Sequence, residues 1–110
     1  MFIPMAISRK AMDYLHLWQE DLLVKKFQQV EIIQGPFPYI RAVRPDKKLF
    51  FGFAAFEPEE VDIRLRQAIE DALEQKCVLF LVTPFNMTEA TRLALGVWGL
   101  DGKVIVESVL

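Results

Sequence analysis

The sequence contains one cysteine, Cys77, and one histidine, His16, among its 110 residues. A single cysteine cannot form an intrachain disulfide, and the place of Cys77 at the start of an apolar segment is typical of a small core residue. The chain must therefore fold without a disulfide framework. This cysteine usage favours a reducing compartment, and we expect a cytoplasmic protein.

Long apolar runs are also missing. No stretch approaches the roughly 20 apolar residues that a membrane-spanning helix needs. The first residues, MFIPMAISRK, place their apolar side chains before the basic pair, which is the reverse of a secretory signal. We therefore expect neither a membrane anchor nor a membrane partner. A formal net charge of -2 further argues against attraction of the whole surface to nucleic acid, so any such binding must be local.

The sequence offers few groups for catalysis or metal binding. His16 shares a predicted helix face with Asp13 and Glu20, which is a possible metal site, but charged residues at this spacing usually form a solvated outer face. Cys77 paired with His16 would be a nucleophile site, but a thiol that opens a buried strand is usually inert. We therefore expect no cofactor, and the balance of residues is against an enzyme.

Apolar residues, by contrast, are abundant, at 53% of the chain, and they include nine phenylalanines. From Glu59 to Gln75 they recur at the spacing of one helix face, and the segment CVLFLV follows directly. Six apolar residues without interruption are typical of a strand that is buried on both faces. This pair of a helix and a central strand, ending near Phe85, predicts the centre of the fold.

The remaining elements follow from periodicity and turn residues. A helix is predicted from Ser8 to about Phe27, with Ser8 as its N-cap. Strands are predicted at 30–33, 39–44 and 49–56, and then at 77–83 and 103–109. Asn86 to Glu89 has the form of a capping box, so another helix is predicted to begin there and to end at Gly96 or Gly99. The prediction is one α/β domain over residues 1–110, in the order αβββαβαβ, with a mixed five-stranded sheet covered by helices on both faces.

Some apolar side chains exceed what one core requires. In the predicted helices and at their ends they are Leu17, Leu23, Phe27 and Trp98. A surplus of this kind indicates a contact surface for another protein or for a second copy of the chain. We therefore expect a protein interface, with a homodimer as the simplest form.

Two other local patterns indicate binding. Arg41, Arg44, Lys47 and Lys48 gather on a predicted hairpin whose other end carries Phe37 and Tyr39, which is the mixture of base and aromatic residues that nucleic acid binding uses. A solvated hairpin tip is the alternative. Thr83, Asn86 and Thr88 lie where a parallel strand meets a helix N-terminus, so an anion or ligand could bind there, although no glycine opens the loop for a phosphate.

The segment LRQAIEDALEQKCVLFLVTPFNMTEATRLALGVWGLDGKVIVESVL resembles the end of Mrr-type members of the PD-(D/E)XK restriction-endonuclease-like superfamily. That resemblance implies a nuclease-like scaffold. In such nucleases an acidic residue near the second strand and a (D/E)-x-K on the third hold Mg²⁺. Here the third strand reads Phe51-Gly52-Phe53, so the catalytic motif is missing. The resemblance therefore implies a scaffold that does not cut.

Together these patterns predict a non-catalytic protein-interaction or regulatory module that associates with itself or with another protein. The alternative is a nucleic-acid-binding protein on an inactive nuclease-like scaffold. The two hypotheses differ in the surface that they use, the surplus apolar side chains in the first and the basic hairpin in the second.

Overall fold

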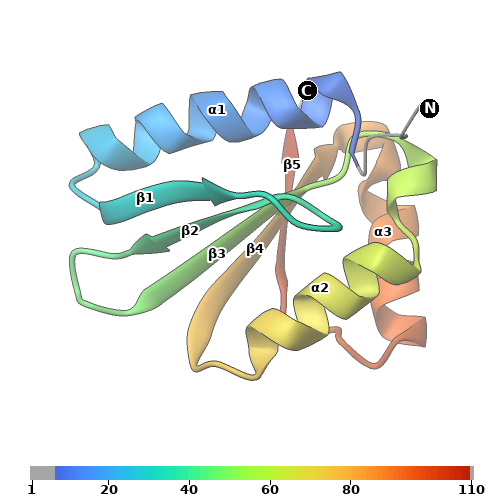
Figure 1. Ribbon diagram of the computed structural model, residues 1–110. Helices are drawn as coiled ribbons and strands as arrows, with labels where there is room; N and C mark the ends of the chain where they lie inside the picture. The colour runs from blue at the N-terminus through green and yellow to red at the C-terminus, as the bar shows by residue number, and fades with distance from the viewer. Residues whose placement is uncertain (1–6, 110) are drawn as a thin grey trace.

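A computed structural model describes residues 7–109 as a mixed β-sheet between two layers of helix (Figure 1). Helix α1 (Arg9–Val24) covers one face, and helices α2 (Ile63–Leu73) and α3 (Thr88–Val97) cover the other. The strands are β1 (Gln28–Ile33), β2 (Tyr39–Val43), β3 (Leu49–Ala54), β4 (Cys77–Pro84) and β5 (Ile105–Val109). The predicted order αβββαβαβ and the mixed five-stranded sheet are confirmed. The first six residues, on which the argument against a secretory signal partly rests, lie outside the described part.

The strands lie in the sheet in sequence order, β1-β2-β3-β4-β5. Strands β1, β2 and β3 pair antiparallel through short connections, and β3, β4 and β5 pair parallel through the crossover helices. Strand β3 therefore forms hydrogen bonds on both sides, and its residues are buried apart from the first. Gly52 in this strand has a packing role, because a Cβ there would lie 2.7 Å from the ring of Trp18 on α1.

Helix α1 begins as predicted and ends earlier than predicted. The hydroxyl of Ser8 accepts a hydrogen bond from the amide of Ala11, which caps the helix. The helix ends at Val24 rather than near Phe27, because Lys26 adopts a positive φ of 70°. The amide of Phe27 then donates back to the carbonyl of Leu22, which closes the last turn and turns the chain toward β1.

The connection from β3 to α2 differs from the prediction of one helix starting at Glu59. A short 3₁₀ helix, η1 (Pro58–Glu60), comes first, and α2 starts only after Asp62. The reason is the carboxylate of Glu60, which is buried and accepts hydrogen bonds from three backbone amides. These donors are Ser8 at 2.7 Å, Phe56 at 2.9 Å and Glu57 at 2.7 Å. Glu60 thus ties the start of α1 to this loop, and Asp62 caps α2.

The predicted capping box at Asn86 is wrong. A second 3₁₀ helix, η2 (Phe85–Met87), precedes α3, whose N-cap is Met87 and has no capping side chain. Met87 turns into the core instead, and the hydroxyl of Thr88 donates to the carbonyl of Pro84. At the other end, Gly99 rather than Gly96 completes the termination, with a φ of 73° that favours glycine.

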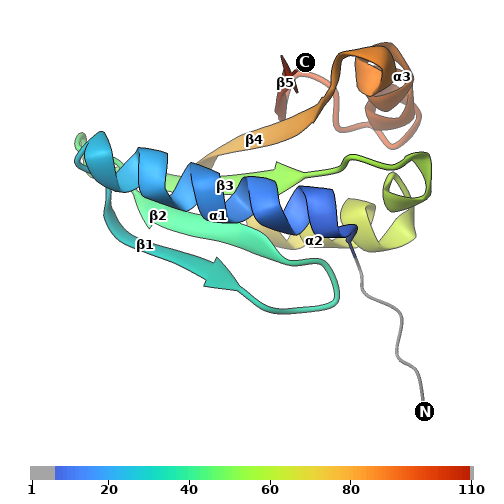
Figure 2. The ribbon, with the colours of Figure 1, turned by 90° about the horizontal axis from the view of Figure 1, so that it is seen from above.

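Each helical layer covers only part of its sheet face. Helix α1 packs on β1, β2 and β3, whereas α2 packs on β4, and α3 packs on β4 and β5. Figure 2 shows the consequence from above, with α1 lying along one half of the sheet while β4 and β5 diverge from it. The sheet therefore keeps two uncovered half-faces. One lies over β1 and β2 on the side of α2, and the other lies over β4 and β5 on the side of α1.

Candidate binding groove

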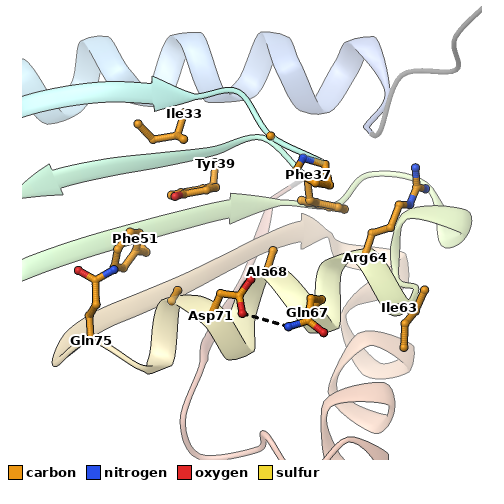
Figure 3. A pocket seen from close by; sticks show the side chains of 13 residues that line it. Ile33, Phe37, Tyr39, Phe51, Ile63, Arg64, Gln67, Ala68, Asp71 and Gln75 are labelled. Atoms are coloured by element: carbon orange, nitrogen blue, oxygen red, sulfur yellow. Dashed lines mark hydrogen bonds between the residues drawn. The ribbon is translucent and has the colours of Figure 1, made fainter.

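A groove of about 470 Å³ opens between α2 and the connection from β1 to β2, over the first uncovered half-face (Figure 3). Its floor is apolar and comes from β1, β2, β3 and the inner edge of α2. The floor residues are Ile33, Phe37, Tyr39, Phe51, Ala68 and Ala72. The ring of Tyr39 packs 5.6 Å from that of Phe51 between ring centroids. Phe37 and Phe51 are buried beneath the floor, whereas Tyr39 and Ile33 are partly exposed and form its accessible apolar surface.

Polar side chains of α2 form one rim of this groove. Arg64, Gln67, Asp71 and Gln75 follow one another at intervals of three or four residues, and all four line the groove. Gln67 Nε2 donates to Asp71 Oδ1 at 3.0 Å, as Figure 3 shows. Arg64 pairs with the N-cap residue Asp62 at 2.8 Å. The rim therefore offers donors and acceptors beside an apolar floor, which is the pattern of a ligand-binding site.

The residues considered for metal or thiol chemistry are His16 and Cys77. Across residues 7–109, no three His, Cys, Asp or Glu side chains lie close enough to hold a metal ion. His16 is exposed on α1. Burial raises the pKa of the Cys77 thiol, which donates to the carbonyl of Ala72 at 3.5 Å, so the reactive thiolate is disfavoured. In the same range, no helix is long and apolar enough to cross a membrane.

The predicted anion site is only partly assembled. Thr83 and Thr88 are buried with their hydroxyl oxygens 3.1 Å apart, and Thr88 also lies 2.6 Å from the hydroxyl of Ser108. Because these hydroxyls bond to one another, they form an internal network between α3 and the ends of β4 and β5. Asn86 is exposed and makes no capping bond. Sequence reasoning did not identify Thr91, which lies beside this network on α3, is 1% exposed and has no partner for its hydroxyl within the described chain.

The four predicted nucleic-acid contacts do not point in one direction. Arg41 shares the sheet face of its partner Phe51, whereas Arg44 faces the other side and pairs with Asp46 at 3.2 Å. Lys47 and Lys48 are exposed at the turn. Nucleic acid binding stays a prediction. A salt-dependent shift of labelled DNA or RNA that Arg44→Glu combined with Lys48→Glu abolishes would support it.

The predicted protein interface divides into two kinds of residue. Leu17 is 65% exposed and Leu23 is 53% exposed, both on α1. Phe27 and Trp98 instead pack partly buried against the core. Trp98 caps α3, on the opposite face of the sheet from Leu17, so these two residues do not share one surface. A homodimer through these residues stays a prediction.

No protein-family model matches the sequence, and neither a curated protein nor a solved structure matches it. The resemblance to Mrr-type proteins therefore stays a prediction as well. Phe51 and Phe53, which that resemblance would place at the positions of the metal ligand and the lysine, are buried in the central strand.

The groove itself was not predicted. Its aromatic residues are individually visible in the sequence, but nothing in their spacing indicates that α2 leaves Tyr39 partly exposed. The only available signal was the polar row on α2 beginning at Arg64, and such a row is equally typical of an ordinary solvated helix face.

Proposed function

We propose that this chain is a non-catalytic interaction module that binds an apolar segment of another protein in the groove beside α2. The observation that carries this proposal is the groove beside α2, where Tyr39 and Ile33 are partly exposed next to the polar row that begins at Arg64. Apolar side chains of a bound segment would cover the floor, and its backbone would meet Gln67, Asp71 and Gln75.

The apolar floor and the few polar groups of the rim together favour a bound peptide over a substrate. Burial of apolar area supplies most of the affinity in such grooves, and a few polar groups fix the orientation of the bound segment. Gln67 donates a hydrogen bond to Asp71 in the free protein. Both side chains lie at the edge of the groove, where an amide group of a bound peptide could replace this hydrogen bond.

A peptide selection tests this proposal. Random peptides displayed on phage are selected on the wild-type protein, and the affinity of the selected peptides is measured by fluorescence anisotropy. Ala68→Trp places a large ring in the groove, and we expect it to weaken binding by about tenfold or more, because a blocked pocket loses its anchor contacts. Ala90→Trp, on the exposed surface of α3, is the matched control and is expected to leave affinity unchanged.

Thermal melting of both variants checks that each is folded. Selected peptides that bind Ala68→Trp as tightly as wild type would contradict the proposal. Sedimentation from micromolar to millimolar concentration then separates the two sources of the segment. A dimer that Ala68→Trp dissociates would identify a second copy as the partner, and a strict monomer would leave another protein.

A further inference from the structure

A second cavity, of about 450 Å³, lies on the opposite face of the sheet from the groove. It is bounded by the C-terminal half of α1, the turn between β2 and β3, and the uncovered surface of β4 and β5. We name it the aromatic pocket after four of its lining residues, Trp18, Phe27, Phe50 and Phe80. Its charged lining residues are Asp46 and Glu107 together with Lys25 and Arg44. The pocket shares no residue with the groove.

Phe50 joins the four rings into one cluster. Its centroid lies 5.7 Å from that of Trp18, 5.5 Å from that of Phe27 and 5.5 Å from that of Phe80. Phe50 itself is buried, whereas the other three rings are only partly buried and border the cavity. Aromatic surface from α1, β3 and β4 therefore surrounds the same space. Aromatic rings attract cations through the negative potential of their faces.

The ion pairs around the pocket leave one carboxylate free. Lys25 is held by Asp21 at 2.8 Å, and Arg44 is held by Asp46 at 3.2 Å. Within residues 7–109, Glu107 makes no ion pair, although it lines the pocket. The side chain of Glu107 lies on β5, on the same side of the sheet as Ile105, whose partner in β4 is Phe80. Glu107 thus stands beside the aromatic cluster without a direct ion pair. Lys25 lines the same pocket, and its pKa is raised mainly by Asp21 and further by the charge of Glu107.

The negative charge of Glu107 also acts on the neighbouring Tyr14. The pKa of its phenol is raised, mainly by burial and further by the charges of Glu107 and Asp21, with Lys25 acting in the opposite direction. Among these charged groups the carboxylates outweigh the lysine. Glu107 therefore places negative charge near this part of α1.

We propose that the aromatic pocket binds an organic cation, a substituted ammonium or a guanidinium group, with Trp18, Phe27 and Phe80 contacting its apolar surface and Glu107 supplying the counter-charge. The volume is suited to a small molecule or to one long side chain. This site is independent of the groove, so it does not depend on the function proposed above.

Choline and its neutral isostere 3,3-dimethylbutan-1-ol test the proposal directly, because the two molecules differ chiefly in charge. The readout is the fluorescence of Trp18 in a Trp98→Phe background, at constant ionic strength maintained with sodium chloride. We expect saturable binding of choline in the millimolar range and an affinity about tenfold lower for the alcohol, as for a desolvated cation against aromatic rings. Equal affinity for the two molecules would overturn the proposal.

Two variants locate the site. Glu107→Gln removes the charge and keeps the shape, and we expect it to lower choline affinity by about tenfold. Glu89→Gln on α3 is the matched control and should leave the affinity unchanged. Phe80→Leu, checked for folding by thermal melting, is expected to weaken choline more than the alcohol. Unchanged choline affinity in both Glu107→Gln and Phe80→Leu would place the cation elsewhere and reject the site.

The cation could be a free amine or a Lys or Arg side chain of another protein. N-acetyl-lysine methylamide and N-acetyl-arginine methylamide, titrated beside choline, separate these sources. Tighter binding of an amino-acid derivative would identify a protein side chain as the ligand. Tighter binding of choline would identify a free substituted ammonium compound. Both results agree with the proposed chemistry. Binding of none of the three would overturn it.

Discussion

Helices α2 and α3 make the same kind of connection but bury opposite kinds of side chain. Each joins two neighbouring parallel strands, and both lie on the same face of the sheet. Helix α2 buries Leu65, Ile69 and Ala72, and α3 buries two threonines together with Leu95. Outward, α3 shows Leu93 at 68% exposure and Val97 at 85%, where α2 shows mostly charged and amide side chains.

The sheet beneath α3 explains this inversion. Thr83 and Ser108 end their strands below the helix and supply hydroxyl partners for Thr88. A buried hydroxyl costs little when it is hydrogen-bonded, so this surface accepts polar side chains, whereas the leucines of β4 under α2 do not. The comparison shows that the identity of the buried helix face depends on the strand surface it meets, and not only on the apolar periodicity of the helix.

The largest effect is expected on the inner face of α2. Ile69→Ala should lower the free energy of unfolding by about 2–5 kcal/mol, because Ile69 is fully buried and its truncation leaves a cavity. Urea denaturation measures this loss. A loss below about 1 kcal/mol would mean that α2 is not packed as described and would break the comparison with α3.

On the inner face of α3 a substitution that raises the free energy of unfolding is expected. Thr91→Val removes a buried hydroxyl without a partner and keeps the shape, so the free energy of unfolding should rise by about 1–2 kcal/mol. Thr88→Val is the matched control, since its hydroxyl is bonded and the same change should destabilise. Equal effects of the two changes would show that both hydroxyls have the same environment.

The N-termini of α2 and α3 are expected to contribute differently to stability as the pH falls. Burial alone would raise the pKa of Asp62, but hydrogen bonds from the side chain of Arg64 and the amides of Leu65 and Arg64 outweigh it and hold this pKa below its ordinary value of 3.8. A lowered folded-state pKa stabilises the fold above the unfolded value and loses that contribution as the pH falls through the folded pKa. Asp62→Ala should therefore cost about 1 kcal/mol at pH 7.

The loss of stability caused by Asp62→Ala should be smaller in strong acid. Thermal melts of the variant and the wild type at pH 7 and below pH 3 measure this difference. Helix α3 has no capping side chain, and Asn86→Ala at its start should show neither the cost nor the pH dependence. A pH-independent cost at Asp62 would contradict the role of its carboxylate.

The smallest effect is expected on the outer face of α3. Leu93→Gln should change the free energy of unfolding by no more than about 0.5 kcal/mol, because the side chain is largely exposed. Chemical denaturation at low protein concentration provides the measurement. A loss as large as that of Ile69→Ala would show that this face is covered in solution and would remove the contrast between the two helices.

Periodicity in the sequence was enough to predict the element order, because each helix and strand carries its own apolar repeat. It failed where a single side chain overrides the repeat. Glu60 turns the chain by binding three amides, and Thr88 bonds back to Pro84 in place of a cap at Asn86. The bond between Ser8 and Glu60 is not visible in the sequence, since the two residues lie 52 positions apart. The groove and the aromatic pocket were missed for the same reason, because both require segments that are distant along the chain.

The sequence by itself determined the αβββαβαβ order and the buried central strand β3. Only the tertiary structure decided which parts of the sheet remain open. A helix about 10 Å wide covers roughly two strands spaced about 4.8 Å apart, so three helices cannot cover both faces of five strands. Register and crossover placement put the uncovered half-faces over β1 and β2 on one side and over β4 and β5 on the other, and the two cavities lie there.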